Sequence, residues 1–326
     1  MQMRMRILIV VLTVIVSGVD VLYGDIPAEK KDSMNPPVFT LNADYIHVYG
    51  DAGTTEDGET RDDEKGAREL ESDECNILAS GNYNIDAMKI KNKAYYKNAD
   101  YSGEGFPETL ISMGGDMFIA NGDYVFLGGI KYAADTYTKS MNAANLQVMG
   151  GVSFYRSGSH SVVAGIFYTT EKLYFDWGTF LPYVTYRYKT KTLILEAPMP
   201  LMVMWRPTKK WNIRLLSVLV IWNTVSIEYR VLPFIGLSAE YSKNNESYYI
   251  HDHPDEEEKL ILEKQSAGGK IRFDIGRYAG LYAYGGYQFG NSYYFSERTS
   301  NWGDDVEKHD IKNSWIVKAG AEIRVF

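Results

Sequence analysis

Residues 111–132 constrain the fold more than any other part of the chain. They contain the dipeptide Asn121-Gly122, which favours a two-residue hairpin turn because both positions must accept a positive φ angle. Pairing the flanking residues about this dipeptide sets Met117 opposite Phe126, and makes one face of the hairpin apolar. The opposite face carries Ser112, Gly114, Asp116, Gly129 and Lys131. One-sided alternation over about ten residues per strand is typical of a strand that crosses a membrane at a tilt.

The same period of two recurs along the rest of the chain. Apolar and polar residues alternate in 144–156, 225–231, 235–242, 270–276 and 315–325, and no helix is indicated after the N-terminal segment. The sequence therefore predicts an all-β fold, an antiparallel up-and-down transmembrane β-barrel of about 12 strands, with a range of about 10 to 14.

The strand number depends on how the segments are divided. The pattern gives strands at 38–49, 76–89, 109–120, 123–133, 144–156, 160–174, 179–190, 193–205, 211–230, 234–250, 260–277, 279–296 and 311–326. This number is odd, whereas bacterial barrels have even numbers, so one segment must be wrongly split or merged. We place the error in 193–230, because Pro198, Pro200 and Pro207 interrupt it and proline cannot continue a closed ladder.

A soluble barrel and a membrane barrel share this alternation but point the apolar face in opposite directions. Aromatic residues near strand ends, such as Tyr45 with Tyr49, Tyr95-Tyr96, Tyr248-Tyr249 and Tyr293-Tyr294-Phe295, favour belts at a membrane interface. The connections also differ in length, with short turns at 121–122, 157–159 and 208–210 and long polar segments at 50–75, 250–259 and 297–310. We therefore predict that the polar face lines the lumen. The lumen-facing candidates are Arg214, Glu228, Arg230, Glu240, Arg272, Asp274, Lys318 and Arg324.

The N-terminus has the layout of a secretory signal peptide. Arg4 and Arg6 precede an apolar run at 7–16, which relaxes into small residues up to Gly24. The run is shorter than the roughly 20 residues that a spanning helix needs. We predict a signal peptide at 1–24, a barrel domain at 25–326, and a location in the outer membrane of a Gram-negative-type bacterium.

One segment concentrates the charge of the chain. Residues 51–74 contain eleven acidic and three basic residues, so their net charge of −8 equals that of the whole chain. The segment lacks the spacing of a calcium-binding loop. We interpret 51–75 as a flexible acidic loop of the barrel domain.

Composition and motif searches exclude several functions. A single Cys75 rules out an intramolecular disulfide, and the negative charge argues against a nucleic-acid partner. His160 and Ser161 are adjacent, so on a strand they point to opposite faces and cannot pair as base and nucleophile. We predict no catalytic residues, no metal site, no cofactor and no enzymatic activity.

Part of the chain resembles an uncharacterised family of bacterial outer-membrane β-barrel proteins, a domain of unknown function. The resemblance rests on residues 195–200 (LEAPMP), 205–211 (WRPTKKW), 227–230 (IEYR) and 236–241 (GLSAEY), and extends over roughly 110–326. It implies location and fold, and no catalytic residues. The acidic segment 51–74 departs from the family's pattern.

We expect an outer-membrane barrel that acts as a narrow channel or binds a small solute whose identity the sequence does not reveal. The alternative is a structural or surface-interaction barrel that acts through its acidic loops, followed by an outer-membrane lipid-modifying enzyme. The expected partners are outer-membrane lipid and the outer-membrane assembly machinery, which commonly reads a terminal aromatic residue such as Phe326.

Overall fold

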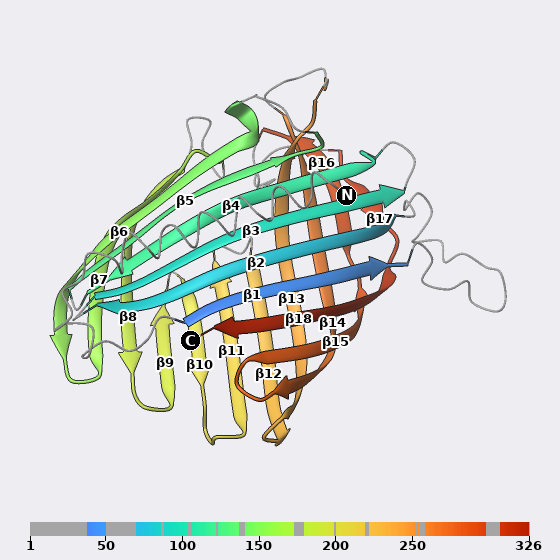
Figure 1. Ribbon diagram of the computed structural model, residues 1–326. Coiled ribbons are helices and arrows are strands. Elements are labelled where there is room, and N and C mark those ends of the chain that lie inside the picture. Colours follow the sequence, from blue (N-terminus) through green and yellow to red (C-terminus); the bar gives the residue numbers. More distant parts are fainter. Residues whose placement is uncertain are drawn as a thin grey trace.

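The computed structural model is a closed antiparallel β-barrel (Figure 1). It describes residues 38–49, 70–85, 88–102, 106–121, 123–136, 141–172, 179–198, 200–218, 222–251, 253, 258–297 and 307–325. The strands are β1 (Val38–Val48), β2 (Glu71–Ile85), β3 (Met88–Ser102), β4 (Thr109–Ala120), β5 (Tyr124–Ala134), β6 (Ala144–Ser157), β7 (His160–Thr169), β8 (Thr179–Lys189), β9 (Leu193–Ala197), β10 (Leu201–Trp205), β11 (Trp211–Val218), β12 (Trp222–Leu232), β13 (Ile235–Tyr249), β14 (Lys259–Ile275), β15 (Ala279–Gln288), β16 (Asn291–Ser296), β17 (His309–Ile311) and β18 (Ser314–Val325). A short 3-10 helix, η2 (Met141–Ala143), precedes β6. Within these ranges, no helix is long and apolar enough to span a membrane.

The predicted signal peptide, the first residues of the predicted barrel domain and Phe326 lie outside the described residues. So does most of the acidic segment, from residue 51 to residue 69.

The barrel has sixteen strands, not about 12. β15 and β16 are consecutive pieces of one strand, because both pair with β14, and β17 and β18 likewise follow one another along the next strand. β18 pairs with β1 and closes the ring.

The observed barrel has three strands more than the sequence pattern gave. The predicted strands 193–205 and 211–230 are each two short strands joined by a tight connection, so the suspected region does contain merged strands. The third is β3, which was not predicted because asparagines interrupt the apolar residues of one face and lysines dominate the other.

The hairpin of β4 and β5 keeps its predicted faces but has a different register. Met117 pairs with Gly128, and Phe126 pairs with Ile119. Asn121 closes the ladder as a flanking residue instead of lying within the turn, since its backbone N–H donates to the Tyr124 carbonyl at 3.0 Å. Its side-chain Oδ1 also accepts from the backbone N–H groups of Asp123 and Tyr124. The predicted pairs are therefore wrong by two residues, a shift that leaves every side chain on the same face.

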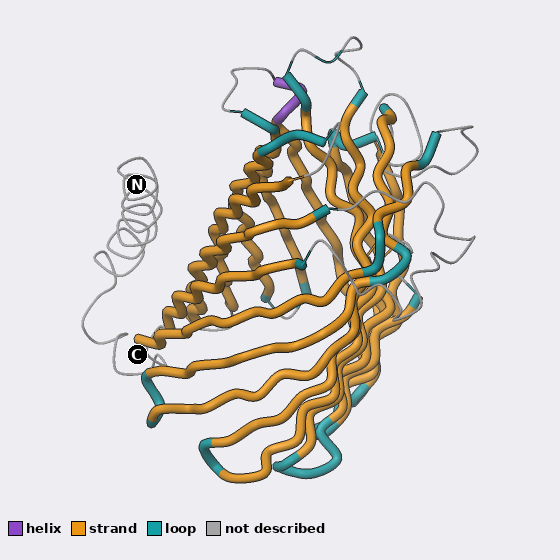
Figure 2. Tube along the Cα trace, turned by 90° about the vertical axis from the view of Figure 1, so that its right-hand side faces the viewer, coloured by secondary structure: helices purple, strands orange, loops and turns teal. Residues whose placement is uncertain are grey.

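The connections of the barrel divide by length between its two ends. At the end that holds the start of β1 and the end of β18, every connection has five residues or fewer. The longer connections all lie at the opposite end, together with the short ones at 198–200 and 219–221. Figure 2 shows η2 among these connections, at the top of the view. We call the two ends the turn end and the long-loop end.

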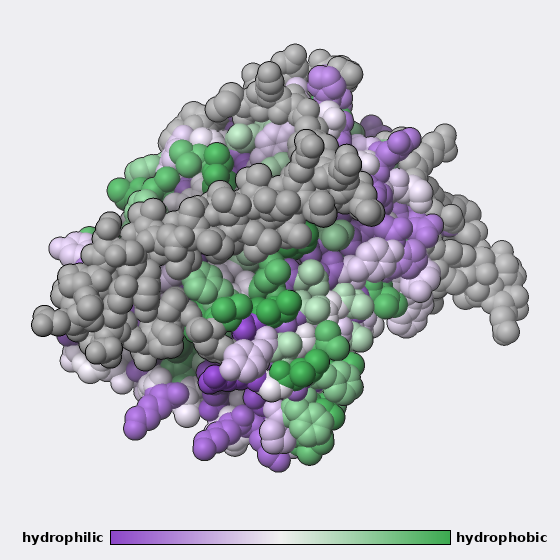
Figure 3. Space-filling view, viewed as in Figure 1, coloured by the Kyte–Doolittle hydropathy of each residue, from purple (hydrophilic) through white to green (hydrophobic). Residues whose placement is uncertain are grey.

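The outward face of the barrel is apolar. Along β18, Trp315, Val317 and Ile323 are 46–57% exposed, and they alternate with residues that face inward. Ile130, Ile166, Val184, Leu237, Phe273 and Leu281 continue this exposed apolar surface around other strands. Figure 3 shows apolar residues gathered over the region where Figure 1 draws β15 and β18, with hydrophilic residues at the rim below.

Interior tyrosines lie against glycines on neighbouring strands. A Cβ atom added to Gly320 would lie 2.5 Å from the ring of its cross-strand partner Tyr282. The same relation holds for Gly114 and Tyr95, where the hydroxyl oxygen would be 2.7 Å away and the nearest ring atom 2.9 Å away. Glycine at these positions gives the aromatic ring room to lie flat on the inner wall of a curved sheet.

Candidate functional site: the lumen

The lumen narrows at the long-loop end because β13 is longer than its neighbour β12. β12 pairs with β13 only as far as Asn244, and the remaining residues of β13 extend past the end of β12. Beyond this point β13 meets β5 on another side of the ring, where Tyr249 pairs with Ala134. The Asp135 backbone N–H donates to the Tyr249 carbonyl at 3.0 Å. Two walls of the barrel therefore touch at this end.

Apolar side chains fill the space between these walls. The cluster joins residues of β3, β4 and β5 to residues of β13, β14, β16 and β17, and Leu110, Leu260 and Leu262 in it are fully buried. Its members are Leu70, Ala99, Tyr101, Phe106, Leu110, Ala133, Tyr248, Leu260, Leu262, Tyr293 and Ile311. Strands that face each other across a barrel thus pack here as two layers of a sandwich.

Four charged side chains lie beside this cluster and cross the lumen. Lys97 Nζ lies 2.8 Å from Glu246 and 3.2 Å from Glu74, while Lys264 Nζ lies 2.6 Å from Glu74 and 3.7 Å from Glu246. All four side chains are less than 20% exposed. We call them the charge quartet. Its two positive and two negative charges balance, as buried charges must to offset their loss of hydration.

Two tyrosines complete the hydrogen bonding of the quartet. Tyr248 Oη donates to Glu246 at 2.9 Å, and Tyr101 Oη donates to Glu74 at 3.3 Å. Lys264 also donates to Tyr101 Oη at 2.9 Å. We call the apolar cluster and the charge quartet together the seal.

The seal was not predicted from the sequence. Glu74 was expected in the acidic loop, whereas it belongs to β2 and its side chain is buried. Tyr248 and Tyr293 were expected in an interfacial belt, whereas both are at most 3% exposed and belong to the interior cluster. The sequence pattern did not show that β13 is longer than β12. Only the residues of β13 that extend past β12 can reach the opposite wall.

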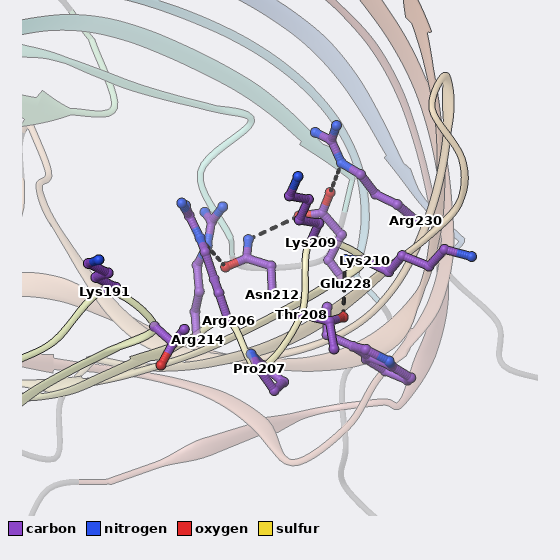
Figure 4. A pocket seen from close by; sticks show the side chains of 12 residues that line it. Lys191, Arg206, Pro207, Thr208, Lys209, Lys210, Asn212, Arg214, Glu228 and Arg230 are labelled. Carbon is purple, nitrogen blue, oxygen red and sulfur yellow. Dashed lines mark hydrogen bonds and ion pairs between the residues drawn. The ribbon is translucent and has the colours of Figure 1, made fainter.

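A cavity of about 600 Å³ lies at the turn end of the lumen. It is formed by the connections 190–192 and 206–210 and by the facing residues of β11 and β12 (Figure 4). Its lining residues are Lys191, Thr192, Arg206, Pro207, Thr208, Lys209, Lys210, Trp211, Asn212, Arg214, Glu228 and Arg230. We call it the turn-side cavity.

The turn-side cavity carries more positive than negative charge. Among its described lining side chains, Glu228 is the one acidic residue, and it accepts from Asn212 at 3.1 Å and lies 3.8 Å from Arg230. Arg206 Nε donates to Asn212 Oδ1 at 3.3 Å, which leaves the other N–H groups of that guanidinium available. Figure 4 shows Arg206, Arg214 and Arg230 extending from the sheet toward the same side.

A second group of ion pairs lies on the inner wall next to the turn-side cavity. Arg272 lies 2.9 Å from Asp274 and 3.0 Å from Glu322, and Arg324 lies 3.3 Å from Asp274 and also contacts Glu322. Arg230 approaches Asp274 at 4.0 Å and thereby links this group to the cavity. The two carboxylates are thus already neutralised by guanidinium groups.

The side chains of the eight lumen-facing candidates point to the same side of the sheet as the charge quartet. In β14, Arg272 and Asp274 are separated from Lys264 by even numbers of residues along an unbroken ladder, so they point to the same side. Glu240 contacts Lys270, and Lys318 lies 4.9 Å from the ring of Tyr284. The structure gathers Arg214, Glu228 and Arg230 at the turn-side cavity, and Arg272, Asp274 and Arg324 beside it.

Two histidines, His47 and His160, lie on the outward face. His47 Nδ1 lies 2.9 Å from Asp73 Oδ1, and Tyr45 donates to the same carboxylate. His160 Nδ1 lies 2.5 Å from Tyr186 Oη, while Ser161 pairs with Arg187, whose side chain bonds to Glu196. Among the described residues, neither histidine forms a hydrogen bond with a serine hydroxyl.

Comparison with protein families identifies the C-terminal part of the chain. Residues 190–324 match the family described as Domain of unknown function (DUF6268). The predicted resemblance to an uncharacterised family is thus confirmed, over a shorter stretch than the expected 110–326. All lining residues of the turn-side cavity and all eight lumen-facing candidates lie within this stretch. No curated protein sequence matches the chain.

Solved structures with a similar arrangement of strands are outer-membrane proteins. An outer membrane channel from Pseudomonas putida F1 has 8% identity and a TM-score of 0.40, with 92% of this chain and 99% of that chain covered. OccK7 of Pseudomonas aeruginosa has 8% identity and a TM-score of 0.34, covering 89% and 98%. The translocator domain of the autotransporter NalP from Neisseria meningitidis has 10% identity and a TM-score of 0.31, covering 91% and 92%. Likeness at this level says nothing about the activity of this chain.

Proposed function

We propose that the protein is an outer-membrane barrel whose lumen is a narrow channel, held closed at the long-loop end and open at the turn end. The outward apolar face supports the membrane location, because an exposed apolar surface of this extent is stable in lipid and unfavourable in water. Exposed aromatic side chains lie outward near both ends, with Tyr45, Tyr49 and Trp315 toward the long loops and Tyr155, Tyr186, Trp205 and Trp211 toward the turns. Short turns at one end and long loops at the other are typical of such barrels.

The observation that carries the proposal is the contact of β5 with β13. A sixteen-strand barrel is wide enough to leave an aqueous channel. Here the seal occupies that space at one end only, and a cavity of about 600 Å³ remains at the other. A barrel that served as a simple scaffold would need no such difference between its two ends.

The experiment is planar-bilayer conductance of the purified full-length chain. The wild type is expected to pass little current, and the double variant Tyr248→Ala/Leu262→Ala to pass several-fold more, because both side chains lie in the seal. The matched control is Val317→Ala/Leu237→Ala, which removes apolar groups from the outward face and should conduct like the wild type. Heat-modifiable gel migration shows whether each variant retains a folded barrel. A folded seal variant with no current at any voltage contradicts the proposal.

A second candidate is a surface-interaction barrel that never opens. The sealed long-loop end favours it, because the acidic connection between β1 and β2 emerges at that same end. Deleting residues 51–69, which spares the buried Glu74, should then abolish a binding or surface phenotype without changing conductance. We further propose that the protein is not an enzyme, in which case substituting each of its histidines leaves lipid composition unchanged.

A further inference from the structure

The turn-side cavity has a charge pattern that the proposed channel does not require. We propose that it binds a small solute carrying two or more phosphate or carboxylate groups. The inference names the chemical class of solute for this lumen and so rests on the proposed function. Binding at equilibrium, however, needs only the open turn end and can be measured apart from conduction.

The wall of the turn-side cavity carries more cations than carboxylates. Glu228 is held by Asn212 and Arg230, and the neighbouring Asp274 is held by Arg272 and Arg324. These contacts use up the carboxylates that line or border the cavity in the described part of the chain. The remaining lining cations are Lys191, Arg206, Lys209, Lys210 and Arg214. Of the lining residues that the structure describes, no further carboxylate compensates them.

On the rest of the inner wall, several cations contact carboxylates, as Lys97 contacts Glu246, Lys270 contacts Glu240 and Arg187 contacts Glu196. Two others have different partners, since Lys318 lies 4.9 Å from the ring of Tyr284 and Lys259 donates to Asn145. Among the described residues, Arg214 contacts no carboxylate, although it points into the lumen from the middle of β11. An exposed surplus of one sign inside a partly enclosed space attracts ions of the opposite sign.

The shape of the cationic groups also matters. Two of the surplus cations, Arg206 and Arg214, are guanidinium groups that line the same cavity, one directly after β10 and the other within the neighbouring β11, and they extend toward the same side in Figure 4. A guanidinium binds phosphate or carboxylate through two parallel hydrogen bonds, whereas an ammonium group acts as a point charge. The cavity volume of about 600 Å³ lies within the usual range for small-molecule sites. A solute with two anionic groups can therefore engage both arginines and still leave the mouth lysines, Lys191 and Lys209, to attract it.

The test measures binding of citrate and of inorganic pyrophosphate to the detergent-purified full-length chain by isothermal titration calorimetry. Glucose serves as the neutral probe, and dispersed short-chain phosphatidylglycerol as the lipid probe. The wild type should bind both free anions, with affinity that falls as the salt concentration rises, and should not bind glucose. Arg206→Gln/Arg214→Gln should weaken binding at least tenfold, because each substitution removes charge-assisted hydrogen bonds.

The matched control is Arg156→Gln/Arg277→Gln. It removes the same charge from the turn end at residues that do not line the cavity, and should bind like the wild type. If the arginine variant loses its fold, Lys191→Gln/Lys209→Gln on the turns provides the second test, with a smaller loss of about threefold expected from point charges.

Three results would overturn the proposal. They are wild-type protein that binds neither free anion, an equal loss in the control variant, and binding of the lipid probe without binding of the free anions. None of these results depends on current across a bilayer. A seal variant that fails to conduct while the wild type binds citrate would instead contradict the proposed channel and leave the anion site standing.

Discussion

The two halves of the lumen contain the same types of charged residue, but the balance of positive and negative charge differs between them. In the seal, two lysines and two glutamates lie in contact and are almost shielded from solvent. At the turn-side cavity, lysines and arginines outnumber the carboxylates and remain exposed to solvent. Burial makes any unpaired charge costly, so the seal must be balanced, whereas an open cavity tolerates a surplus. The difference indicates that charge balance in this barrel follows solvent access along the lumen.

The largest effect is expected from breaking the balance of the seal. Lys97→Met removes one cation of the charge quartet and should lower the free energy of unfolding by about 3–5 kcal/mol, because two buried carboxylates are left with one lysine. Arg214→Met removes a cation of the turn-side cavity and should change it by less than about 0.5 kcal/mol. Urea titration of both variants in lipid vesicles measures the two values. Equal values would show that the halves do not differ in the way described.

A somewhat smaller effect is expected from the apolar part of the seal. Leu262→Ala should lower the free energy of unfolding by about 2–4 kcal/mol, because its side chain is fully buried and leaves a cavity. Leu281→Ala is the matched substitution on the outward face, where the side chain is 48% exposed and no cavity forms. The same titration should give a clearly smaller loss for Leu281→Ala. A loss as large as that of Leu262→Ala would contradict the assignment of Leu262 to a packed interior.

The smallest effect concerns the surplus charge of the turn-side cavity. Asp274→Asn removes a carboxylate that Arg272 and Arg324 contact, and it should raise the affinity for citrate about twofold, since the added net positive charge acts through water. Calorimetry at low salt measures the change, and high salt should abolish it. Asp123→Asn, at an exposed position beside Arg156, provides the control with the same change of net charge. Weaker citrate binding by Asp274→Asn would show that this carboxylate orients the site and does not merely neutralise it.

The faces of the strands could be predicted from the sequence because alternation is a local property. Met117 and Phe126 were placed on one face and Asp116 on the other, and the two-residue error in register did not disturb that division. Arg272, Asp274 and Arg324 could be chosen for the same reason, although the ion pairs among them could not.

The strand number and the seal could not be predicted because they depend on contacts between distant segments. Lys97 and Glu246 are 149 residues apart, and Lys264 and Glu74 are 190 apart. No local pattern indicates which residues will meet across a lumen. The strand β3 was missed for a different reason, since its outward face carries Asn92 and Asn98 among apolar residues and its inward face is rich in lysine.

The seal is built from the wall of the barrel and not from a separate loop or domain. Residues of β3, β13 and β14 that close the lumen are held in ladders with their neighbours, so they cannot be expelled while the barrel stays closed. Opening would require β5 and β13 to move apart at the long-loop end. In a bilayer, such a change enlarges the area that the protein occupies among the lipids, so lateral pressure in the membrane would act directly on the closed state.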